Sequence, residues 1–594
     1  MKVSVASVHF PAGSRIRIGR VMCKAVVYIA ALFLVAVSFS SAEAGEANID
    51  KTVARWVDFF TPSGLSKEDA AKELLWFHEA AKPFEGKEIR VAAEDIETHY
   101  WERDVLAQAF REITGIAVKF DVIPEGDIIL NITEQMMTGR MIYDAYVNDA
   151  DLIGTHTRLG KVVNLTEYMA GEGKPYTDPW LDLPDFLNLE FGQDYDGNQL
   201  QLPDQQFPIL YWFRYDWFND EETKRDFRKR YGYELGVPVN WSAYEDIAEF
   251  FTGRTMKNPN GSTVKAYGHL DYGKPSPSLG WRFTDAWLSV AGMGDKGLPN
   301  GRPVDEWGIR VEDRVPVGSM VERGGQLNGP AAVYGLTKYI EWMDKYAPPY
   351  AKNIEWSEFG PIPGEGAIAQ TIYFCGTFAS YPGYHKAGSP VCDSNGNPLW
   401  RVAPQPHGVY WEEGMKVGYQ DAGSWTIPSN VRGKQRAMAW LFAQFCVSKT
   451  VSVKKFIIGG TPNRRSTVEH PYIMKNASRW GGLVEFYSSR DEKTFTGTGL
   501  NVPNYPALSG LWWEHIAAAV KGEYTPQQAM DTLAAEQDEL MGSMKFTRYS
   551  PKLNPVMSKE YWLERPDGPK AKRPEREKPV TIAYDDILKG WGMR

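Results

Sequence analysis

The chain has little cysteine for its length. Four cysteines stand among 594 residues, and Cys23 is the only one near the N-terminus. So few cysteines exclude a small fold that is held together by disulfides. Cys446 lies in the apolar run 440–447 and is predicted to be a buried thiol. Cys375 and Cys392 either pair in an oxidising compartment or stay apart, and their spacing along the chain does not decide between the two.

The motifs of common cofactor and metal sites are missing or occur in the wrong setting. The sequence contains no Walker loop, no H-E-x-x-H and no C-x-x-C, and its nine histidines are scattered. A G-x-G-x-x-G match at 292–297 follows a predicted helix instead of a strand, which favours a loop over a dinucleotide site. Asp149 and Asp151 have the spacing that begins a calcium loop, but the closing glutamate of an EF-hand is missing. We therefore predict no cofactor, no metal site and no catalytic residue.

Basic charge and long apolar runs are also scarce. Asp and Glu outnumber Lys and Arg by 75 to 66, which disfavours nucleic acid as a partner. The longest apolar run, 25–39, is shorter than the roughly 20 residues of a membrane span. It follows a basic region and precedes Ala42-Glu43-Ala44, which is typical of a signal peptide cleaved before Gly45. The true start is either Met1 or Met22, and we predict a soluble periplasmic monomer that is not inserted in the membrane.

Aromatic residues are abundant, with 21 Trp, 30 Tyr and 27 Phe. Large rings commonly fill protein cores, and they also suit clefts that stack on the carbon faces of sugars and polyols. The composition is compatible with both uses.

The N-terminal third alternates strands and helices. Strands are expected at 88–93, 116–123 and 144–147, with helices at 100–114 and 131–139 between them. This order predicts βαβ units with a parallel sheet, in which ligands bind beyond the carboxyl ends of the strands. The polar residues that follow the first and third strands are Glu94, Asp95, His99, Asn148, Asp149 and Asp151.

The segment 198–217 reads as a strand that is interrupted at Pro203. Because proline fixes φ and cannot donate to a sheet, the strand must bend there or pass between two sheets. A crossing between two lobes would form a hinge and would place Asp204 and Gln205 beside aromatic rings, which suits a neutral, hydroxyl-rich ligand. The alternative is a kinked core strand with surface amides.

A second α/β lobe is expected after this segment. A strand at 266–270 leads into Asp271 and Tyr272, a helix at 281–291 begins with Trp281, and a strand-to-helix region begins at 421. We predict the following organisation: signal peptide 1–44, lobe 1 at 45–203 and 404–458, lobe 2 at 204–403 and 459–545, and a C-terminal extension at 546–594.

Several segments resemble a known family, the extracellular solute-binding protein family 1 of ABC importers, and most closely its glycerol-type members. The segments are VNDADLIGTH (147–156), LPDQQFPILYWFRYDWF (202–218), VPVNWSAYEDIAEFFTGR (237–254), SLGWRFTDAWLSVAG (278–292) and GYQDAGSW (418–425). The resemblance extends from about residue 50 to the C-terminus. It implies an α/β fold of the type II, maltose-binding-protein-like periplasmic binding proteins, with two lobes joined by hinge crossovers.

The resemblance also implies positions for the ligand. Cleft residues of the maltose-binding relative fall on Asn148, Asp151, Tyr272, Phe378 and Trp512, and the absence of tryptophan at 148 and 378 implies a ligand smaller than, or placed differently from, an oligosaccharide. For a small polyol, aspartates would accept hydroxyl hydrogens and aromatic rings would cover the carbon face. The candidate ligand-binding residues are Asp95, Asn148, Asp149, Asp151, Asp204, Gln205, Asp271, Tyr272, Trp281, Phe378, Asp421, Trp425 and Trp512.

The function implied by the resemblance is capture of a small polyol or sugar, with glycerol the first candidate, and its delivery to the transmembrane subunits of an ABC permease. The chain itself would not be an enzyme. One alternative is an exported carbohydrate-active hydrolase with a carboxylate pair in the cleft. Another is a ligand adaptor for a chemotaxis receptor, which the sequence does not separate from an importer component.

Overall fold

The computed structural model describes residues 46–283, 287–293, 307–375, 381–489, 495–497 and 499–592. The chain divides into two compact units, Met1–Ile49 and Asp50–Arg594, and everything below concerns the second. The predicted signal peptide (1–44) and the candidate residue Phe378 lie outside the described residues. Within the described residues, no helix has both the length and the apolar character to cross a membrane.

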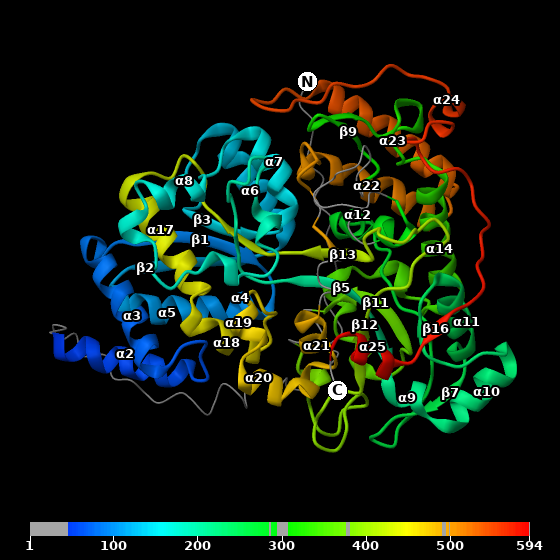
Figure 1. Ribbon diagram of the computed structural model, residues 1–594, viewed down its shortest axis with the longest axis horizontal. Coiled ribbons are helices and arrows are strands. Elements are labelled where there is room, and N and C mark those ends of the chain that lie inside the picture. The colour runs from blue at the N-terminus through cyan, green and yellow to red at the C-terminus, as the bar shows by residue number, and fades with distance from the viewer. Residues whose placement is uncertain are drawn as a thin grey trace, which may run out of the picture. The chain divides into compact units, whose positions relative to one another are not determined.

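The first sheet has five strands in the order β2-β1-β3-β14-β4. Strands β1 (Glu88–Glu94), β2 (Ala117–Ile123) and β3 (Ala145–Asn148) are parallel, as the βαβ pattern predicts. Helices α6 (Glu125–Thr138) and α17 (Gly433–Cys446) both pack on β1 and β3 (Figure 1). β1 is buried from Val91 to its end because helices cover the sheet.

The helices of the first lobe differ from the predicted ranges in two places that matter for the site. α6 begins at Glu125, earlier than the predicted 131, because Pro124 precedes an acidic first turn. The helix predicted at 100–114 consists of α4 (Glu97–Trp101), a π-helical turn at Glu102–Leu106, and α5 (Ala107–Thr114). The π turn carries the buried Glu102, which pairs with Lys455.

The second sheet is built around β5 (Phe207–Arg214). Its order is β11-β5-β13-β15, and β12 (Trp400–Ala403) also pairs with β5. β11 (Gln370–Phe374) and β13 (Gly418–Asp421) are antiparallel to β5, whereas β15 (Phe495–Thr496) is parallel to β13. On this sheet the ring of Trp212 packs against those of Tyr373, Tyr384 and Trp400, so much of the aromatic content fills this core.

The chain crosses between the sheets at two adjacent places. β4 (Leu202–Pro203) pairs in the first sheet and β5 in the second, so the strand interrupted at Pro203 does pass between two sheets. β13 lies in the second sheet and β14 (Ser424–Thr426) in the first. The Gly423 carbonyl oxygen accepts from the backbone N–H groups of Asp204 (2.7 Å) and Gln205 (3.1 Å), which ties the two crossovers together.

Sheet membership places one boundary differently from the sequence prediction. The return to the first lobe was expected at residue 404, but β13 still belongs to the second sheet, and the crossing follows Asp421. The strand expected at 266–270 is reduced to a single bridge at Tyr267, next to Gly268, whose position leaves no room for a Cβ. The other lobe boundaries stay predictions.

The C-terminal extension lies along the second lobe. It contains α24 (Lys559–Leu563), β16 (Thr581–Ile582) and α25 (Tyr584–Gly590), and β16 pairs with β6 (Val237–Pro238). The thiols of Cys375, Cys392 and Cys446 are all buried and free, so Cys375 and Cys392 are not joined. Burial raises the pKa of each of the three thiols.

Candidate functional site

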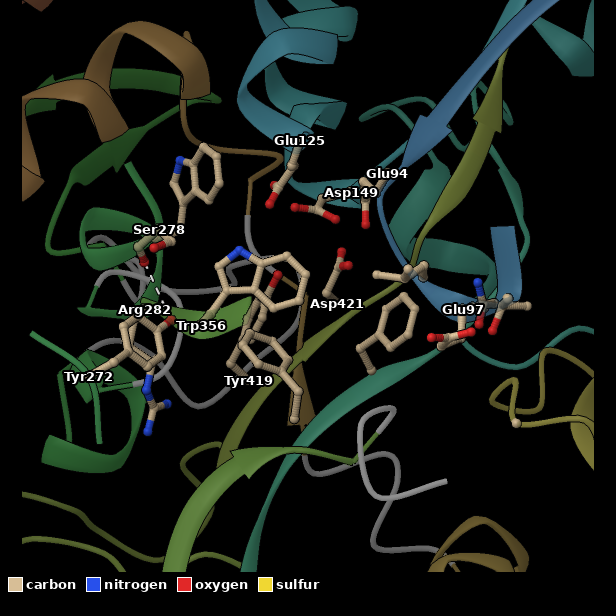
Figure 2. A pocket seen from close by; sticks show the side chains of 17 residues that line it. Glu94, Glu97, Glu125, Asp149, Tyr272, Ser278, Arg282, Trp356, Tyr419 and Asp421 are labelled. Carbon is tan, nitrogen blue, oxygen red and sulfur yellow. Dashed lines mark hydrogen bonds between the residues drawn. The ribbon is translucent and has the colours of Figure 1, made fainter. Parts of the chain in front are cut away.

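A cavity of about 120 Å³ lies at the crossovers between the two sheets (Figure 2). Residues of both lobes line it. The side chains from the first lobe are largely acidic, and those from the second lobe are largely aromatic. The lining residues are Glu94, Ile96, Glu97, Thr98, Glu125, Asp149, Gln205, Phe207, Tyr272, Ser278, Trp281, Arg282, Trp356, Phe374, Tyr419, Asp421 and Gly459.

We call Glu94, Glu97, Glu125 and Asp149 the first-lobe wall. Glu94 ends β1 and Asp149 follows β3, so the carboxyl ends of two parallel strands supply them. Glu125 is the first residue of α6, where a helix N-terminus favours a negative charge. Figure 2 shows the carboxyl groups of Glu94, Glu125 and Asp149 close together, with Asp421 opposite them.

The carboxyl groups of this region repel one another. Burial raises the pKa of Glu94, Glu125 and Asp421 well above the usual range, and the neighbouring charge of Asp149 adds to each shift. Glu94 is 7% exposed and Asp421 is 4% exposed. Such a group of acids needs either shared protons or a ligand that compensates for the charge.

We call Tyr272, Trp281, Trp356 and Phe374 the second-lobe wall. Trp281 lies on α12 (Pro277–Arg282), and its indole N–H donates to the Ser509 hydroxyl (3.2 Å), which fixes the ring. Trp356 is half-buried and begins α15 (Trp356–Phe359). Aromatic faces of this kind pack well against apolar carbon surface while their polar edges bond elsewhere.

Arg282 also lines the cavity, but its charge is compensated within the second lobe. Its guanidinium binds the Asp271 carboxylate through Nε (3.2 Å) and Nη2 (3.1 Å), and Nη2 also donates to the Ile372 carbonyl oxygen (2.6 Å). Trp287 donates its indole N–H to the same carboxylate (3.2 Å). Both members of the pair are fully buried, so Arg282 does not neutralise the first-lobe wall.

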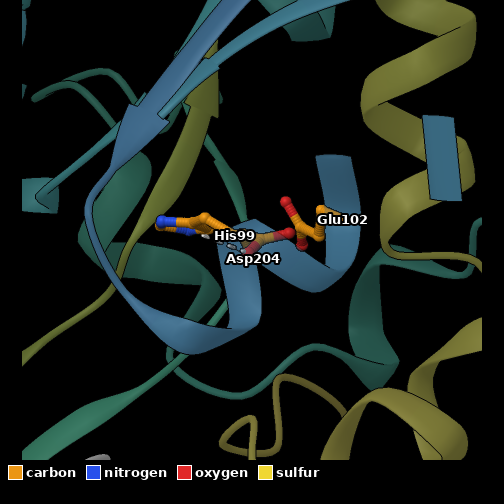
Figure 3. A group of neighbouring side chains, drawn as sticks. All are labelled: His99, Glu102 and Asp204. Atoms are coloured by element: carbon orange, nitrogen blue, oxygen red, sulfur yellow. Dashed lines mark ion pairs between the residues drawn. The ribbon is translucent and has the colours of Figure 1, made fainter. Parts of the chain in front are cut away.

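A buried polar network lies behind Gln205. The ammonium group of Lys455 pairs with Glu102 and lies 2.6 Å from Asp204, whose Oδ1 also accepts from the indole N–H of Trp425 (3.0 Å). His99, Glu102 and Asp204 are close enough to share a metal ion (Figure 3). Lys455 already serves as their counterion, so this group is structural.

His99 connects this network to the cavity. Its Nε2 lies 3.3 Å from the Gln205 side-chain nitrogen and 3.9 Å from the Asp204 carboxylate. Burial lowers the pKa of His99 to about 4, so the ring is neutral near pH 7 and its Nε2 can accept from Gln205. This contact orients a side chain that lines the cavity.

The cavity brings together five of the residues selected from the sequence: Asp149, Gln205, Tyr272, Trp281 and Asp421. They come from both crossovers, from the end of β3, and from the segment around α12. Whether they bind a ligand stays a prediction.

Other candidates lie outside the cavity lining. Asp95 is exposed and accepts from the Tyr100 hydroxyl (2.6 Å). Asn148 is buried within β3, and Asp151 accepts from the Tyr419 hydroxyl (2.8 Å) beneath the cavity surface. Asp204 and Asp271 belong to the buried ion pairs described above.

The tryptophans Trp425 and Trp512 are core residues. Trp425 packs against Phe120 and Phe442 in the first lobe, and Trp512 packs against Phe283 and Trp307 in the second. Both are fully buried. Their rings stabilise the lobes and do not line the cavity.

The sequence analysis missed several lining residues. Glu94 was noted at the end of its strand but Asp95 was selected, because alternation along a strand does not show which side chain turns toward the ligand. Glu125 was missed because the helix was expected to begin later, although Pro124 with an acidic first turn was the available signal. Trp356, Tyr419 and Arg282 had no local signal that separates a lining residue from a core residue.

Comparisons with known proteins agree with this architecture. No protein-family model matches the chain. The erythritol/L-threitol-binding protein of Mycolicibacterium smegmatis is 22% identical over 389 residues, which cover 64% of this chain and 71% of that protein. An ABC transporter solute-binding protein from Agrobacterium radiobacter, solved with ribitol, has a TM-score of 0.58 and 21% identity over 77% of this chain and 100% of its own.

Two further structures are similar. The maltose-bound MalE3 protein of T. maritima has a TM-score of 0.57 and 16% identity over 76% of this chain and 100% of its own. A solute-binding protein from Agrobacterium vitis, solved with D-mannitol, has a TM-score of 0.55 and 16% identity over 78% of this chain and 100% of its own. The chain therefore has the type II periplasmic binding protein fold with two lobes and crossovers, as the resemblance predicted.

Proposed function

We propose that the protein is the substrate-binding component of an ABC transporter, that it captures an acyclic sugar alcohol in the cavity, and that it delivers this solute to a membrane permease. The observation that carries the proposal is the division of the cavity into an acidic and an aromatic wall at the crossovers of a binding-protein fold. Export to the periplasm by residues 1–44 and a monomeric state belong to the same proposal.

A sugar alcohol has a hydroxyl on every carbon, so it offers many hydrogen-bond donors along one flexible chain. Ionised carboxyl groups are acceptors only, which suits them to bind hydroxyl hydrogens. The carboxyl groups of Asp149 and Asp421 lie near each other (Figure 2), and the Gln205 side chain, which also lines the cavity, contacts His99. Trp281 and Trp356 provide faces for the carbon chain.

The similar proteins narrow the choice of ligand without deciding it. Their names and bound ligands include erythritol or L-threitol, ribitol and D-mannitol. We therefore propose a sugar alcohol of four to six carbons in place of the glycerol favoured by the sequence analysis. Glycerol is retained as one ligand in the experiment below.

Capture would use closure of the lobes. Residues of both lobes line the cavity, so a ligand that contacts both walls stabilises the closed arrangement relative to the open one. Gly423 bonds both crossovers and makes them one connected hinge. The hydrolase alternative is not favoured, because the similar proteins are binding proteins.

A thermal-unfolding screen tests the proposal on the chain from Gly45 onward. The ligands are erythritol, ribitol, D-mannitol, glycerol and maltose, and each is recovered afterwards and analysed. At about 100 times the dissociation constant, a true ligand adds about 2.7 kcal/mol to the free energy of unfolding. We expect a raised midpoint with at least one sugar alcohol and unchanged ligand. No shift with any of them would contradict the polyol proposal, and consumption of maltose would support the hydrolase.

A further inference from the structure

Three carboxylates from two distant segments meet at the cavity wall, two of them lining the cavity and Asp151 directly beneath its surface. Asp149 and Asp151 follow β3, whereas Asp421 ends β13 of the other sheet, and each provides an oxygen within 4.8 Å of the others. Two of the three are held in place: Asp421 accepts from the backbone N–H of Ala150 (3.2 Å), and Asp151 accepts from the Tyr419 hydroxyl (2.8 Å). We call Asp149, Asp151 and Asp421 the aspartate triad.

A fourth carboxylate points toward the triad and has an unused oxygen. Only 7% of the Glu94 surface is exposed, and its Oε1 has no hydrogen-bond partner among the described residues. Figure 2 shows its carboxyl group beside Asp149 and facing the cavity. A buried acceptor without a donor is costly unless a ligand satisfies it.

No cationic side chain of the described residues forms an ion pair with Asp149, Asp421 or Glu94. Two buried basic groups already have acidic partners: Arg282, which lines the cavity, pairs with Asp271, and Lys455 pairs with Glu102 and Asp204. Among the described residues, Glu94, Asp149 and Asp421 therefore have no basic side chain as a counterion.

The ligand atoms and their spacing fit a particular ion. The four groups offer only oxygen atoms, which selects hard cations over zinc or copper. Calcium takes oxygen ligands at about 2.3 to 2.6 Å, so oxygens on opposite sides of one ion lie about 4.6 to 5.2 Å apart. The triad oxygens lie within 4.8 Å of one another, so one ion of this size can contact all three. Calcium also takes six to eight ligands, more than the triad and Glu94 provide as single donors.

We propose that a calcium ion binds the aspartate triad and Glu94, and that its open coordination positions take hydroxyl oxygens of the sugar alcohol. Binding of the ion stands on the carboxylates alone, whereas the bridging role rests on the proposed function. The ion would join the first lobe, through Asp149 and Asp151, to the second, through Asp421. Specificity would then depend on two neighbouring hydroxyls that can bind the same ion.

Calcium binding is tested without any polyol. The chain from Gly45 is treated with EGTA, desalted, and titrated with CaCl₂ by calorimetry and with TbCl₃ by luminescence excited through the nearby aromatic rings. We expect one calcium ion per chain, terbium luminescence that calcium displaces, and an affinity that falls at least about tenfold in Asp421→Asn and in Asp151→Asn. Asp127→Asn is the matched control, because Asp127 is an exposed acid on α6 outside the cavity lining.

The bridging role is tested by titrating erythritol, ribitol and D-mannitol in calcium and in EGTA. An affinity at least tenfold weaker in EGTA supports it, and an equal affinity in both overturns it. If calcium does not bind but a polyol does, the ion is excluded and the proposed function stands. If calcium binds but no polyol does, the ion is supported and the proposed function fails. Binding of N-methylglucamine in EGTA, with no calcium binding, would identify a cationic ligand instead and overturn the proposal.

Discussion

The two walls of the cavity differ in how their charged side chains are compensated. In the second lobe, the buried guanidinium of Arg282 forms an ion pair with Asp271, and that wall presents aromatic rings to the cavity. In the first lobe, Glu94, Glu125 and Asp149 crowd together without a basic partner among the described residues. The charge of Arg282 is thus used within the fold, whereas the acids of the first-lobe wall are available for a ligand.

This difference follows from where the walls originate. Strand ends and a helix N-terminus supply the acids of the first lobe, and these are positions where the backbone fixes polar groups at one edge of a sheet. Helices α12 and α15, the end of strand β11 and the segment around Tyr272 supply the rings of the second lobe. Substitutions in the second-lobe ion pair should therefore affect stability first, whereas those in the first-lobe wall should affect binding.

The largest effect is expected from the buried ion pair. Arg282→Met leaves the Asp271 carboxylate buried with only neutral donors, so we expect a loss of about 3 to 5 kcal/mol in the free energy of unfolding. Urea denaturation followed by tryptophan fluorescence measures it. The double variant Arg282→Met/Asp271→Leu should recover a large part of the loss. A single variant as stable as the wild type would show that the pair does not hold the second lobe.

The next largest effect is expected in the first-lobe wall, on ligand binding instead of stability. Asp149→Asn should weaken sugar-alcohol binding by about 1.5 to 3 kcal/mol, because a charged acceptor is lost. It should not lower the stability of the ligand-free protein, since removing its charge relieves the repulsion on Glu94, Glu125 and Asp421. Calorimetry and urea denaturation are compared with the Asp127→Asn control. A destabilised protein with unchanged binding would reverse the assignment of this residue.

Acid should destabilise the protein through one buried histidine in each lobe, in addition to His99. His156 of the first lobe and His269 of the second are fully buried, and burial lowers the pKa of each to about 3. Between that value and about 6.5, the unfolded chain binds more protons than the folded one, so stability falls as the pH falls.

From neutral pH to pH 5.5, each of these histidines should remove about 1.4 kcal/mol from the free energy of unfolding. Urea denaturation at the two pH values measures the loss, and His156→Gln and His269→Gln should each reduce it by that amount. A pH dependence unchanged in both variants would mean that neither ring is held neutral.

A smaller effect is expected from the aromatic wall. Trp356→Ala removes the ring but keeps the backbone carbonyl that accepts from the Tyr373 hydroxyl (2.6 Å). We expect a loss of about 1 kcal/mol in binding of a sugar alcohol and little change in stability, because the ring is only half-buried. Calorimetry measures the affinity. Equal affinity in wild type and variant would remove this ring from the site.

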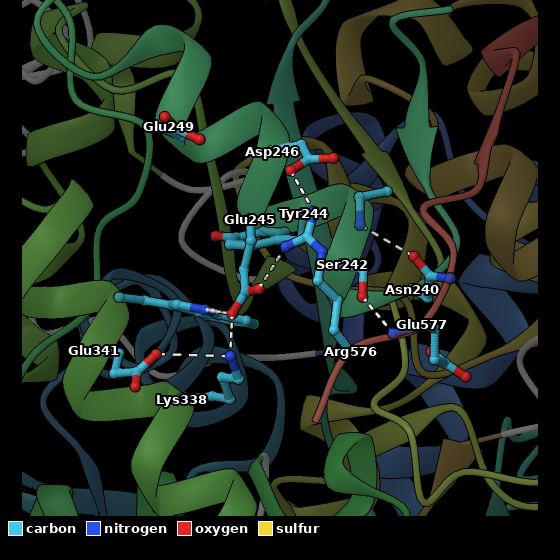
Figure 4. A network of polar contacts seen from close by, with 12 residues as sticks. Asn240, Ser242, Tyr244, Glu245, Asp246, Glu249, Lys338, Glu341, Arg576 and Glu577 are labelled. Carbon is cyan, nitrogen blue, oxygen red and sulfur yellow. Dashed lines mark hydrogen bonds and ion pairs between the residues drawn. The ribbon is translucent and has the colours of Figure 1, made fainter. Parts of the chain in front are cut away.

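The smallest effect on stability is expected from an exposed ion pair, which serves as a reference for the buried pair of Arg282 and Asp271. Arg576 of the C-terminal extension pairs with Asp246 (2.6 Å) and Glu245 (3.4 Å), and Glu245 also pairs with Lys338 (Figure 4). The Arg576 side chain is 50% exposed, so Arg576→Ala should cost about 0.2 to 1 kcal/mol. Denaturation at low and high salt measures it. A loss as large as that of Arg282→Met would mean that exposure does not separate the two kinds of pair.

Much of the fold follows from local pattern. The parallel part of the first sheet follows from the alternation of strands and helices. The first crossover follows from Pro203, which ends β4 and has no N–H to donate to a sheet. The end of the helix before residue 116 follows from Gly115, whose φ of 72° is the left-handed conformation that favours glycine. These features depend on neighbours in sequence.

The site is less visible in the sequence because it depends on contacts between distant segments. Asp149 was selected as an acid at a strand end, and it lines the cavity. The same pattern selected Asp204 and Asp271, which form buried ion pairs with Lys455 and Arg282. Trp425 and Trp512 are of a residue type that is common in sugar-binding clefts, but both are buried in the core. The meeting of Asp421 with Asp149 and Asp151, which prompts the calcium proposal, exists only in three dimensions, and the sequence alone predicted no metal site.

Calorimetric titration of the chain from Gly45 with erythritol, ribitol, D-mannitol and glycerol, in buffer with calcium, tests the central claim most directly. The account predicts one sugar alcohol bound per chain by the wild type and by Asp127→Asn, with affinity weakened in Asp149→Asn and in Trp356→Ala. Binding by the wild type that neither cavity variant weakens, or the absence of binding by any of these ligands, would contradict it.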